Sequence, residues 1–290
     1  MLFLQLLATG IQTGALYALT AAGFALIFGA TRIFHVAHGA TFALAGYVFA
    51  ACVNGGLGWP IGCGLAAIVA VGFGLGMELL VYRPIQRHEA SFFTVFVAAL
   101  GAVIVVQSFI EIVFGRGFTS VTTSMTRAVE VVPGFFLAPV FAVVIIAAIL
   151  MFGSVILFLE RTQTGLGLRA LSENPELLRA YGLSSRRLST IAFALGSLLT
   201  VPAAVLTAAT SGLGSSIGAH VMLISLAASV VGGIGNLRGA ACAGLLLGVT
   251  ESLVVSFLDT QWSEAAGFVL LFAFILFRPN GLFGRSASAK

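Results

Sequence analysis

Four polar positions interrupt long apolar runs, and such groups are where a membrane-embedded chain can bind or move a polar solute. Glu251 lies in GVTESLVVSF, Gln107 lies in VIVVQSFIEI, and His35 and His38 share the stretch TRIFHVAHGA. A carboxylate inside hydrocarbon is costly. Glu251 is therefore expected either on a pathway or gate, or in a structural tie to a serine or backbone group of a neighbouring helix. Solute recognition, rather than bond breaking, is the chemistry that these residues predict.

The histidines and Gln107 each allow two interpretations. His35 and His38 would line a gate or bind substrate, or they would cap and anchor helix ends at the membrane interface, because a histidine by itself seldom indicates a ligand site. Gln107 and the nearby Glu111 would face the pathway, or they would lie at its wet outer rim. The residue types leave both alternatives open.

Four glycines, at two places in the chain, are further candidate positions. Gly39 begins a short apolar segment, and Gly232, Gly233 and Gly235 interrupt the run LISLAASVVGGIGNLRGAACAGLLLG. Discontinuous membrane helices, which expose backbone groups to a solute, form the binding sites of many transporters. These glycines are therefore predicted as pathway or gate positions.

The stretch from Glu160 to Arg187 differs from the rest of the chain. It reads ERTQTGLGLRALSENPELLRAYGLSSRR and holds five of the fourteen basic residues and three of the ten acidic ones. Burying so many charges in a bilayer would cost several kcal/mol each, so this stretch is an aqueous loop. Its excess of arginine places it in the cytoplasm.

A short helix is predicted over residues 173–182 of this loop. Proline favours the first position of a helix, and Asn174-Pro175 precede ELLRAYG. The spacings of three and four among Leu177, Leu178 and Tyr181 predict one apolar face. Such a helix would dock in the groove of a soluble partner, or it would cover the inner end of the bundle. The residues assigned to this surface are Glu173, Glu176, Leu177, Leu178, Tyr181 and Gly182.

The elements that must position these residues are membrane helices. The chain is 59% hydrophobic and 8% charged, whereas a soluble domain is about 25% charged. Three of the apolar segments are short, so eight or nine of them span the membrane. The predicted fold is an all-α, polytopic helix bundle that forms one domain over 1–290, with 160–187 as its cytoplasmic loop. The segments are 3–29, 39–53, 60–82, 91–114, 135–159, 188–210, 219–233, 240–257 and 264–278.

The basic residues orient the bundle. With nine crossings and 160–187 in the cytoplasm, only Arg116 and Arg127 of the fourteen basic residues fall outside. This asymmetry is the positive-inside pattern, and it places the N-terminus outside and the C-terminus inside. The inner set is Arg32, Arg83, Arg87, Arg161, Arg169, Arg179, Arg186, Arg187, Arg238, Arg278, Arg285 and Lys290.

Several classes of function are disfavoured. The chain contains no GxxxxGK[ST], HExxH or CxxC pattern, so we expect neither an ATPase site of its own nor an enzyme. The net charge of +4 reflects loop arginines and predicts no nucleic-acid partner. Cys52, Cys63 and Cys242 lie in apolar runs at spacings that suit neither disulfides nor a metal site, and no cofactor is expected.

Over nearly its whole length the sequence resembles the permease subunits of bacterial ABC importers for branched-chain amino acids, in particular the shorter of their two permeases. ABC permeases more widely carry E-A-A followed by glycine; Glu176 and Gly182 keep that spacing, but the alanines are missing. The stretches that carry the resemblance are GALYALTAAGFALIFGATRIFHVAHGATFALAGY at 14–47, YRPIQ at 82–86, RALSENPELLRAYGL at 169–183, SVVGGIGNLRGAACAGLLLGVTESL at 229–253 and FRPNGLFG at 277–284.

The resemblance implies a multi-pass protein of the bacterial inner membrane, surrounded by lipid, that passes an amino acid inward. It implies cytoplasmic ATPase subunits seated on the 173–182 helix, a second and longer permease, and a periplasmic substrate-binding protein. Three alternatives remain open: an ABC permease for urea, amides or a sugar; a homodimer in place of a heterodimer; and a self-sufficient secondary transporter or channel that would use Glu251 for coupling.

Overall fold

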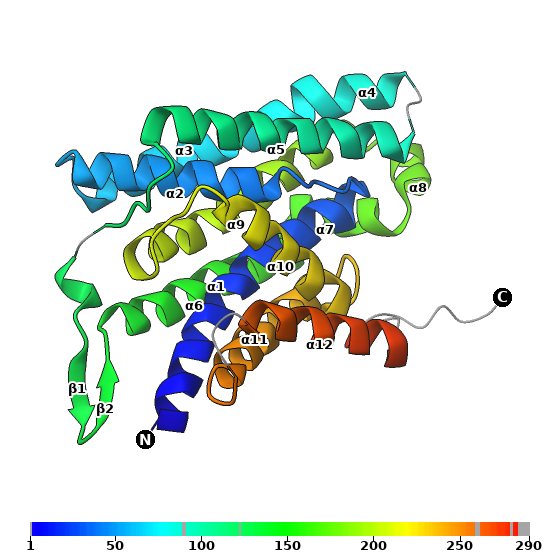
Figure 1. Cartoon of the computed structure of the whole chain (residues 1–290). Coiled ribbons are helices and arrows are strands. Elements are labelled where there is room, and N and C mark those ends of the chain that lie inside the picture. The colour runs from blue at the N-terminus through cyan, green and yellow to red at the C-terminus, as the bar shows by residue number, and fades with distance from the viewer. Residues whose placement is uncertain (1, 89–90, 122, 259–261, 279–280, 284–290) are drawn as a thin grey trace.

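The computed structural model describes residues 2–88, 91–121, 123–258, 262–278 and 281–283, and these residues form a bundle of helices (Figure 1). Each of the nine predicted apolar segments overlaps a helix. The helices that correspond to these segments are α1 (Leu2–Thr31), α2 (His38–Asn54), α3 (Trp59–Gly76), α5 (Phe92–Phe114), α6 (Val140–Arg161), α9 (Ser185–Thr210), α10 (Ile217–Gly232), α11 (Leu237–Val254) and α12 (Ser263–Phe277).

Six of the described helical stretches are long and apolar enough to cross a membrane. They begin in α1, α3, α5, α6, α9 and α11, whereas α10 and the part of α12 from Ala265 to Phe277 are apolar but shorter. The multi-pass helical bundle is therefore confirmed, while the number of eight or nine crossings stays a prediction.

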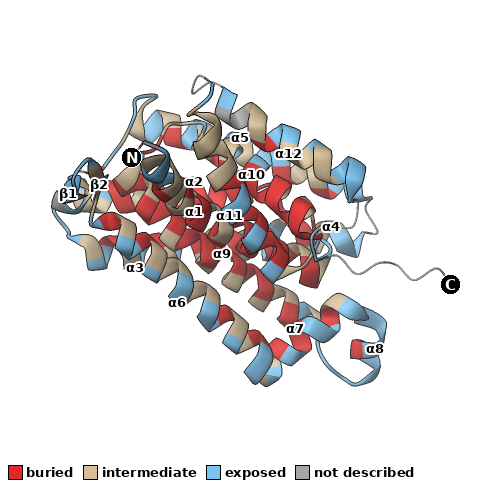
Figure 2. Ribbon diagram, turned by 90° about the horizontal axis from the view of Figure 1, so that it is seen from below, coloured by how far each residue is buried: buried red, intermediate tan, exposed pale blue. Residues whose placement is uncertain are grey.

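Small residues let the central helices approach closely. A methyl group at Gly14 of α1 would lie 2.7 Å from the carbonyl oxygen of Leu245 in α11, and one at Gly244 would lie 2.7 Å from the backbone nitrogen of Ala18. In lipid, where there is no hydrophobic drive between helices, such backbone contact is a main source of helix–helix affinity. Figure 2 shows the result: buried residues concentrate on α1, α2, α9, α10 and α11.

The outer helices are apolar but poorly covered. In an apolar 18-residue stretch of α1, 78% of the residues are buried inside the protein, whereas the corresponding stretches of α6 and α5 have 17% and 22% of their residues buried. Ile104, Ile112 and Ile149 are among the large exposed side chains of α5 and α6. A helix that is apolar on all sides and exposed suits contact with lipid or another membrane subunit.

The prediction of an all-α chain is wrong at one place. Val129–Val132 (β1) pairs antiparallel with Phe135–Leu137 (β2), after a 3₁₀ turn at Ser124–Thr126 (η2). The predicted apolar segment 135–159 therefore begins in a strand, and its helix starts only at Val140, directly after Pro139. The side-chain oxygen of Gln5 accepts a 3.0 Å hydrogen bond from the backbone N–H of Phe136, which holds this hairpin beside the start of α1.

The ends of the bundle differ in charge. At one end Arg32 donates to the carbonyl of Ser172, Arg83 reaches the carbonyl of Arg186, and Arg238 pairs with Glu160. The backbone N–H groups of Leu282 and Phe283 donate to carbonyls at the end of α10, so the described C-terminal residues lie at this basic end. The hairpin and the start of α1 lie at the opposite end (Figure 1).

Candidate functional site

A π-helical segment, η1 (Met77–Tyr82), joins α3 to the short helix α4 (Arg83–Arg87). A π-helix takes more residues per turn than an α-helix, so side chains five apart come close to alignment. Arg83 accordingly donates 2.8 and 3.0 Å hydrogen bonds to the two oxygens of Glu78, and a 2.9 Å bond to Thr190 of α9. Glu78 and Arg83 thus form an ion pair where η1 meets α4.

Replacing Arg83 with glutamine is expected to lower the free energy of unfolding by about 2 kcal/mol, because it leaves the carboxylate of Glu78 without its cation. The Glu78 side chain is only 5% exposed, so water cannot replace the guanidinium. The double variant Glu78→Gln/Arg83→Gln should regain most of the loss. Thermal unfolding of the purified protein measures this, and a double variant as unstable as the single one would contradict it.

His35 and His38 lie together in the interior. His35 Nδ1 is 2.8 Å from the hydroxyl of Tyr82, and His38 Nε2 donates to the backbone oxygen of Thr20 at 2.9 Å. The ring centroids of the two histidines are 5.9 Å apart, and Phe193 packs against His35. Both side chains are fully buried, and His38 is the first residue of α2. Their role in a gate stays a prediction.

The candidate glycines occupy helix contacts and a turn. A Cβ at Gly39 would overlap the carbonyl of Gly218, so α2 and α10 touch by their backbones there. Gly232 contacts Gly239 in the same way. Gly233 and Gly235 lie in the turn between α10 and α11 at the basic end, with φ values of 107° and 79°. The glycine-rich interruption of the apolar run is therefore the turn of a helical hairpin. A pathway role for these glycines stays a prediction.

Gln107 lies on α5, one turn before Glu111. Its amide nitrogen is 3.4 Å from Glu111 Oε1, and Arg116 donates to Glu111 Oε2 at 3.0 Å. The side chain of Arg116 is 86% exposed, so this row of polar groups leads from the helix to the surface. The geometry favours a position of Gln107 at the outer rim of the pathway. A role inside the pathway stays a prediction.

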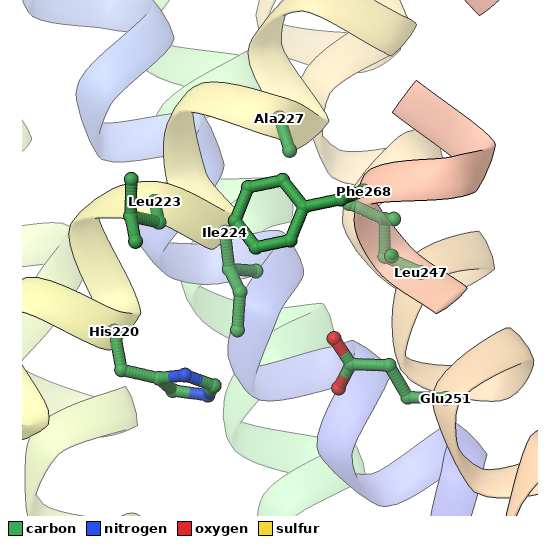
Figure 3. Close-up of a pocket in the computed structure, with 8 residues that line it drawn as sticks. His220, Leu223, Ile224, Ala227, Leu247, Glu251 and Phe268 are labelled. Atoms are coloured by element: carbon green, nitrogen blue, oxygen red, sulfur yellow. The ribbon is translucent and has the colours of Figure 1, made fainter. Parts of the chain in front are cut away.

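Glu251 is tied to another helix. Its Oε2 accepts a 2.9 Å hydrogen bond from the hydroxyl of Tyr17 in α1. The Tyr17 hydroxyl also lies 3.5 Å from His220 Nε2 in α10. Figure 3 shows His220 and Glu251 pointing toward each other across a small cavity. Sequence reasoning missed Tyr17 and His220. His220 interrupts an apolar run as His35 and His38 do and could have been found by that signal, whereas a tyrosine in such a run gives no signal of its own.

The loop 160–187 forms two helices in place of one over 173–182. Helix α7 spans Gln163–Glu173 and α8 spans Pro175–Ala180. Thr162 caps α7 by accepting from the N–H of Gly165, and Asn174 caps α8 by accepting from the N–H of Leu177. Because the backbone of Asn174 is extended, Glu173 ends α7 and does not belong to the shorter helix.

The apolar residues of α8 do not share one face. Leu178 is 3% exposed and belongs to the same buried cluster as Leu171 and Leu188, whereas Leu177 and Tyr181 are 54% and 78% exposed. Leu178 thus fastens α8 to the bundle, and the other two project outward beside Glu176. Gly182 follows with a φ of 77°, a left-handed conformation that glycine adopts without strain.

Comparison with known proteins decides the family. A model of the permease component of the branched-chain amino acid transport system matches residues 6–277. The chain belongs to this permease family. It is therefore a permease subunit of an importer, and the family implies ATPase and substrate-binding partners.

Two relatives align with almost the whole sequence of the permease. It is 27% identical over 303 residues to LivH of Escherichia coli strain K12, a high-affinity branched-chain amino acid transport system permease protein; the alignment covers 99% of this chain and 97% of the relative. It is also 27% identical to BraD of Pseudomonas aeruginosa, with the same description, over 99% and 98% of the two chains.

A solved structure shares the fold of the permease. PsaBC from Streptococcus pneumoniae, in complex with Fab, superposes with a TM-score of 0.55 over 97% of this chain and 94% of the other. The identity is 14%, so this likeness concerns the fold alone. With the apolar helices described above, the family shows a multi-pass membrane protein.

Proposed function

We propose that this permease carries branched-chain amino acids into a bacterial cell across the inner membrane, driven by ATPase subunits in the cytoplasm. The family match over residues 6–277 is the observation that carries this proposal. The described transport systems of its relatives support the substrate class. A second, longer permease would complete the path, and a periplasmic binding protein would deliver the substrate.

The basic end of the bundle faces the cytoplasm in this proposal. Arg32, Arg83 and Arg238 contact residues of the 160–187 loop or its immediate neighbours, so these inner-set arginines gather at one end. Arg116 lies beyond the far end of α5. Arg285 and Lys290 of the predicted inner set lie outside the described residues. The N-terminus is then outside, the C-terminus inside, and all nine apolar segments cross.

Helices α7 and α8 form the proposed ATPase-docking surface. Gly165 of α7 lies against the backbone of Leu159, Gly167 lies against Leu188 of α9, and Arg32 at the end of α1 donates to Ser172. Closure of the ATPase dimer would push on Leu177 and Tyr181, and these contacts would carry the push to α9 and α1. Rigid-body rocking of the helices would then open the path to alternate sides.

The permease contributes no hydrolytic site of its own in this proposal. The letters GSSIG at 214–218 match G-x-S-x-G, the pattern of a nucleophile elbow. That elbow needs a strand that runs directly into a helix, whereas here a turn joins α9 to α10. Among the described residues, no group of three or more His, Cys, Asp or Glu side chains could hold a metal ion.

Purification from the native membrane, followed by reconstitution in vesicles, tests the proposal. We expect an ATPase and a second permease to accompany the chain, and radiolabelled leucine, isoleucine or valine to enter only with ATP and the binding protein. ATP-driven uptake of urea, amides or a sugar instead would overturn the substrate class. Uptake by the chain alone without ATP would show a secondary transporter or channel.

A further inference from the structure

The cavity beside Glu251 has a volume of about 30 Å³ and lies between α10, α11 and α12. Its inner wall is buried and apolar, formed by Ile224, Ala227 and Leu247. Leu223 and Phe268 are each 47% exposed and form its mouth. In Figure 3 the imidazole of His220 and the carboxylate of Glu251 border the cavity from opposite sides, below the ring of Phe268.

The two polar residues that line this cavity, His220 and Glu251, lie well inside the membrane helices, as does the neighbouring Tyr17. Tyr17 is about 21 Å along α1 from Thr31 at the basic end, at 1.5 Å per residue. Glu251 lies roughly 20 Å along α11 from Arg238, and His220 roughly 18 Å along α10 from Gly232, by the same rise. Three helices thus bring a hydroxyl, a carboxylate and an imidazole to one level, about two-thirds of the way across a hydrocarbon layer of about 30 Å.

We propose that this cavity is a subsite for a primary ammonium group attached to a short apolar chain. The carboxylate of Glu251 would accept hydrogen bonds from the ammonium, Tyr17 would hold that carboxylate in place, and the apolar chain would lie against Leu223 and Phe268. The inference rests on the proposed function in one respect: in the cell, the ligand would be the amino acid that the permease carries.

Size and charge both favour an ammonium group. A volume of about 30 Å³ admits about two water-sized groups, so the head of a ligand fits while its apolar chain must remain at the mouth. The carboxylate selects a cation, and a buried cation needs an anionic partner. A carboxylate accepts at several positions around its two oxygens, and Tyr17 donates to Oε2 of Glu251.

Gly267 of α12 keeps this space open. A methyl group there would lie 3.2 Å from Glu251 Oε1 and would narrow the cavity from the side of α12. The variant Gly267→Ala therefore reduces the space while the charge of Glu251 stays unchanged. It provides a second way to test the subsite if removal of the carboxylate disturbs folding.

Protection of a cysteine from alkylation tests the proposal without any transport. Leu223→Cys is placed in a chain whose Cys52, Cys63 and Cys242 are serines, and the assembled importer is held in phosphatidylcholine nanodiscs, which supply no primary ammonium. Isobutylamine is expected to slow alkylation of Leu223→Cys, whereas isovalerate, which has the apolar chain and no ammonium, is not. Equal protection by both compounds, or by neither, would overturn the proposal.

Variants of the residues around the cavity test whether these groups cause the protection. Glu251→Gln is expected to raise the half-protecting concentration of isobutylamine at least about tenfold, the worth of a hydrogen bond to a charged group. Tyr17→Phe and Gly267→Ala should raise it less. Glu111→Gln, which removes a helix-borne carboxylate paired with Arg116, serves as the matched control and should leave it unchanged. An unchanged value in Glu251→Gln would contradict the subsite.

The cysteine-protection experiment can fail or succeed independently of the proposed function. If isobutylamine protects the cysteine but the importer carries no branched-chain amino acid, the subsite is supported. Only the assumption that the transported amino acid is its ligand would then be wrong. ATP-driven leucine uptake without protection would overturn the subsite alone. If phosphatidylethanolamine in the nanodisc protects and isobutylamine does not, the assignment to a soluble ligand is wrong.

Discussion

Replacing both Leu177 and Tyr181 with alanine is expected to lower ATP-driven uptake more than about tenfold, since tyrosine is one of the residue types that supply most of the energy of an interface. Leu177 lies on α8 and Tyr181 directly follows it, and the two side chains are 54% and 78% exposed next to the basic end of the bundle. Leu178 still fastens α8 to the core, so the fold should not change. Uptake into vesicles and co-purification of the ATPase subunits measure the effect.

Leu80→Ala is the matched control for this loss. Leu80 is 78% exposed on η1, as exposed as Tyr181, but it lies outside the proposed ATPase-docking surface. It should keep both uptake and the ATPase. If the Leu177→Ala/Tyr181→Ala variant retained normal uptake, α8 would only cover the end of the bundle, which is the alternative that the sequence left open.

The change Gly39→Ala is expected to destabilise the permease by about 3 kcal/mol, the upper end of the usual cost of overpacking. A methyl group there would overlap the carbonyl of Gly218 and lie 2.9 Å from Met222 Cβ. Backbone cannot rotate away as a side chain can, so α2 and α10 would have to separate. Thermal unfolding in detergent should show a lower midpoint, by roughly 6 °C or more for this free-energy change.

Gly64→Ala provides the control, because a methyl group at Gly64 would meet nothing within 4 Å. That variant should be as stable as the parent or slightly more so, since alanine favours a helix over glycine by about 1 kcal/mol. A Gly39→Ala protein with an unchanged midpoint but impaired uptake would contradict the packing role and favour the pathway role predicted from the sequence.

Hydropathy and charge predicted the helices of this fold because both properties are local. Each apolar segment long enough for hydrocarbon became a helix, and Asn174-Pro175 correctly marked the start of α8. The π-helical turn that aligns Glu78 with Arg83 was not predicted. Nothing in MELLVY distinguishes a π-turn from an α-turn, since both suit the same apolar side chains.

The candidate site was less predictable because its contacts join distant helices. Glu251 stood out as a charge in an apolar run, but its partner Tyr17 is 234 residues away along the chain. The sequence left open whether His35 and His38 line a gate or anchor helix ends, and only the fold shows that both side chains are buried. Leu177 and Leu178 are neighbours of similar chemistry, and only the docking of α8 decides which one turns inward.

The close contact between α1 and α11 has a consequence for biosynthesis. Gly14 and Leu245 are separated by about 230 residues, and at about 5–20 residues per second a ribosome needs roughly 10–50 s to make them. During that time the glycine face of α1 has no α11 to pack against and must rest on lipid or on an assisting protein. Variants that weaken this face leave α1 unpacked after the chain is complete as well, so proteases should remove them, which would appear as low abundance rather than as slow transport.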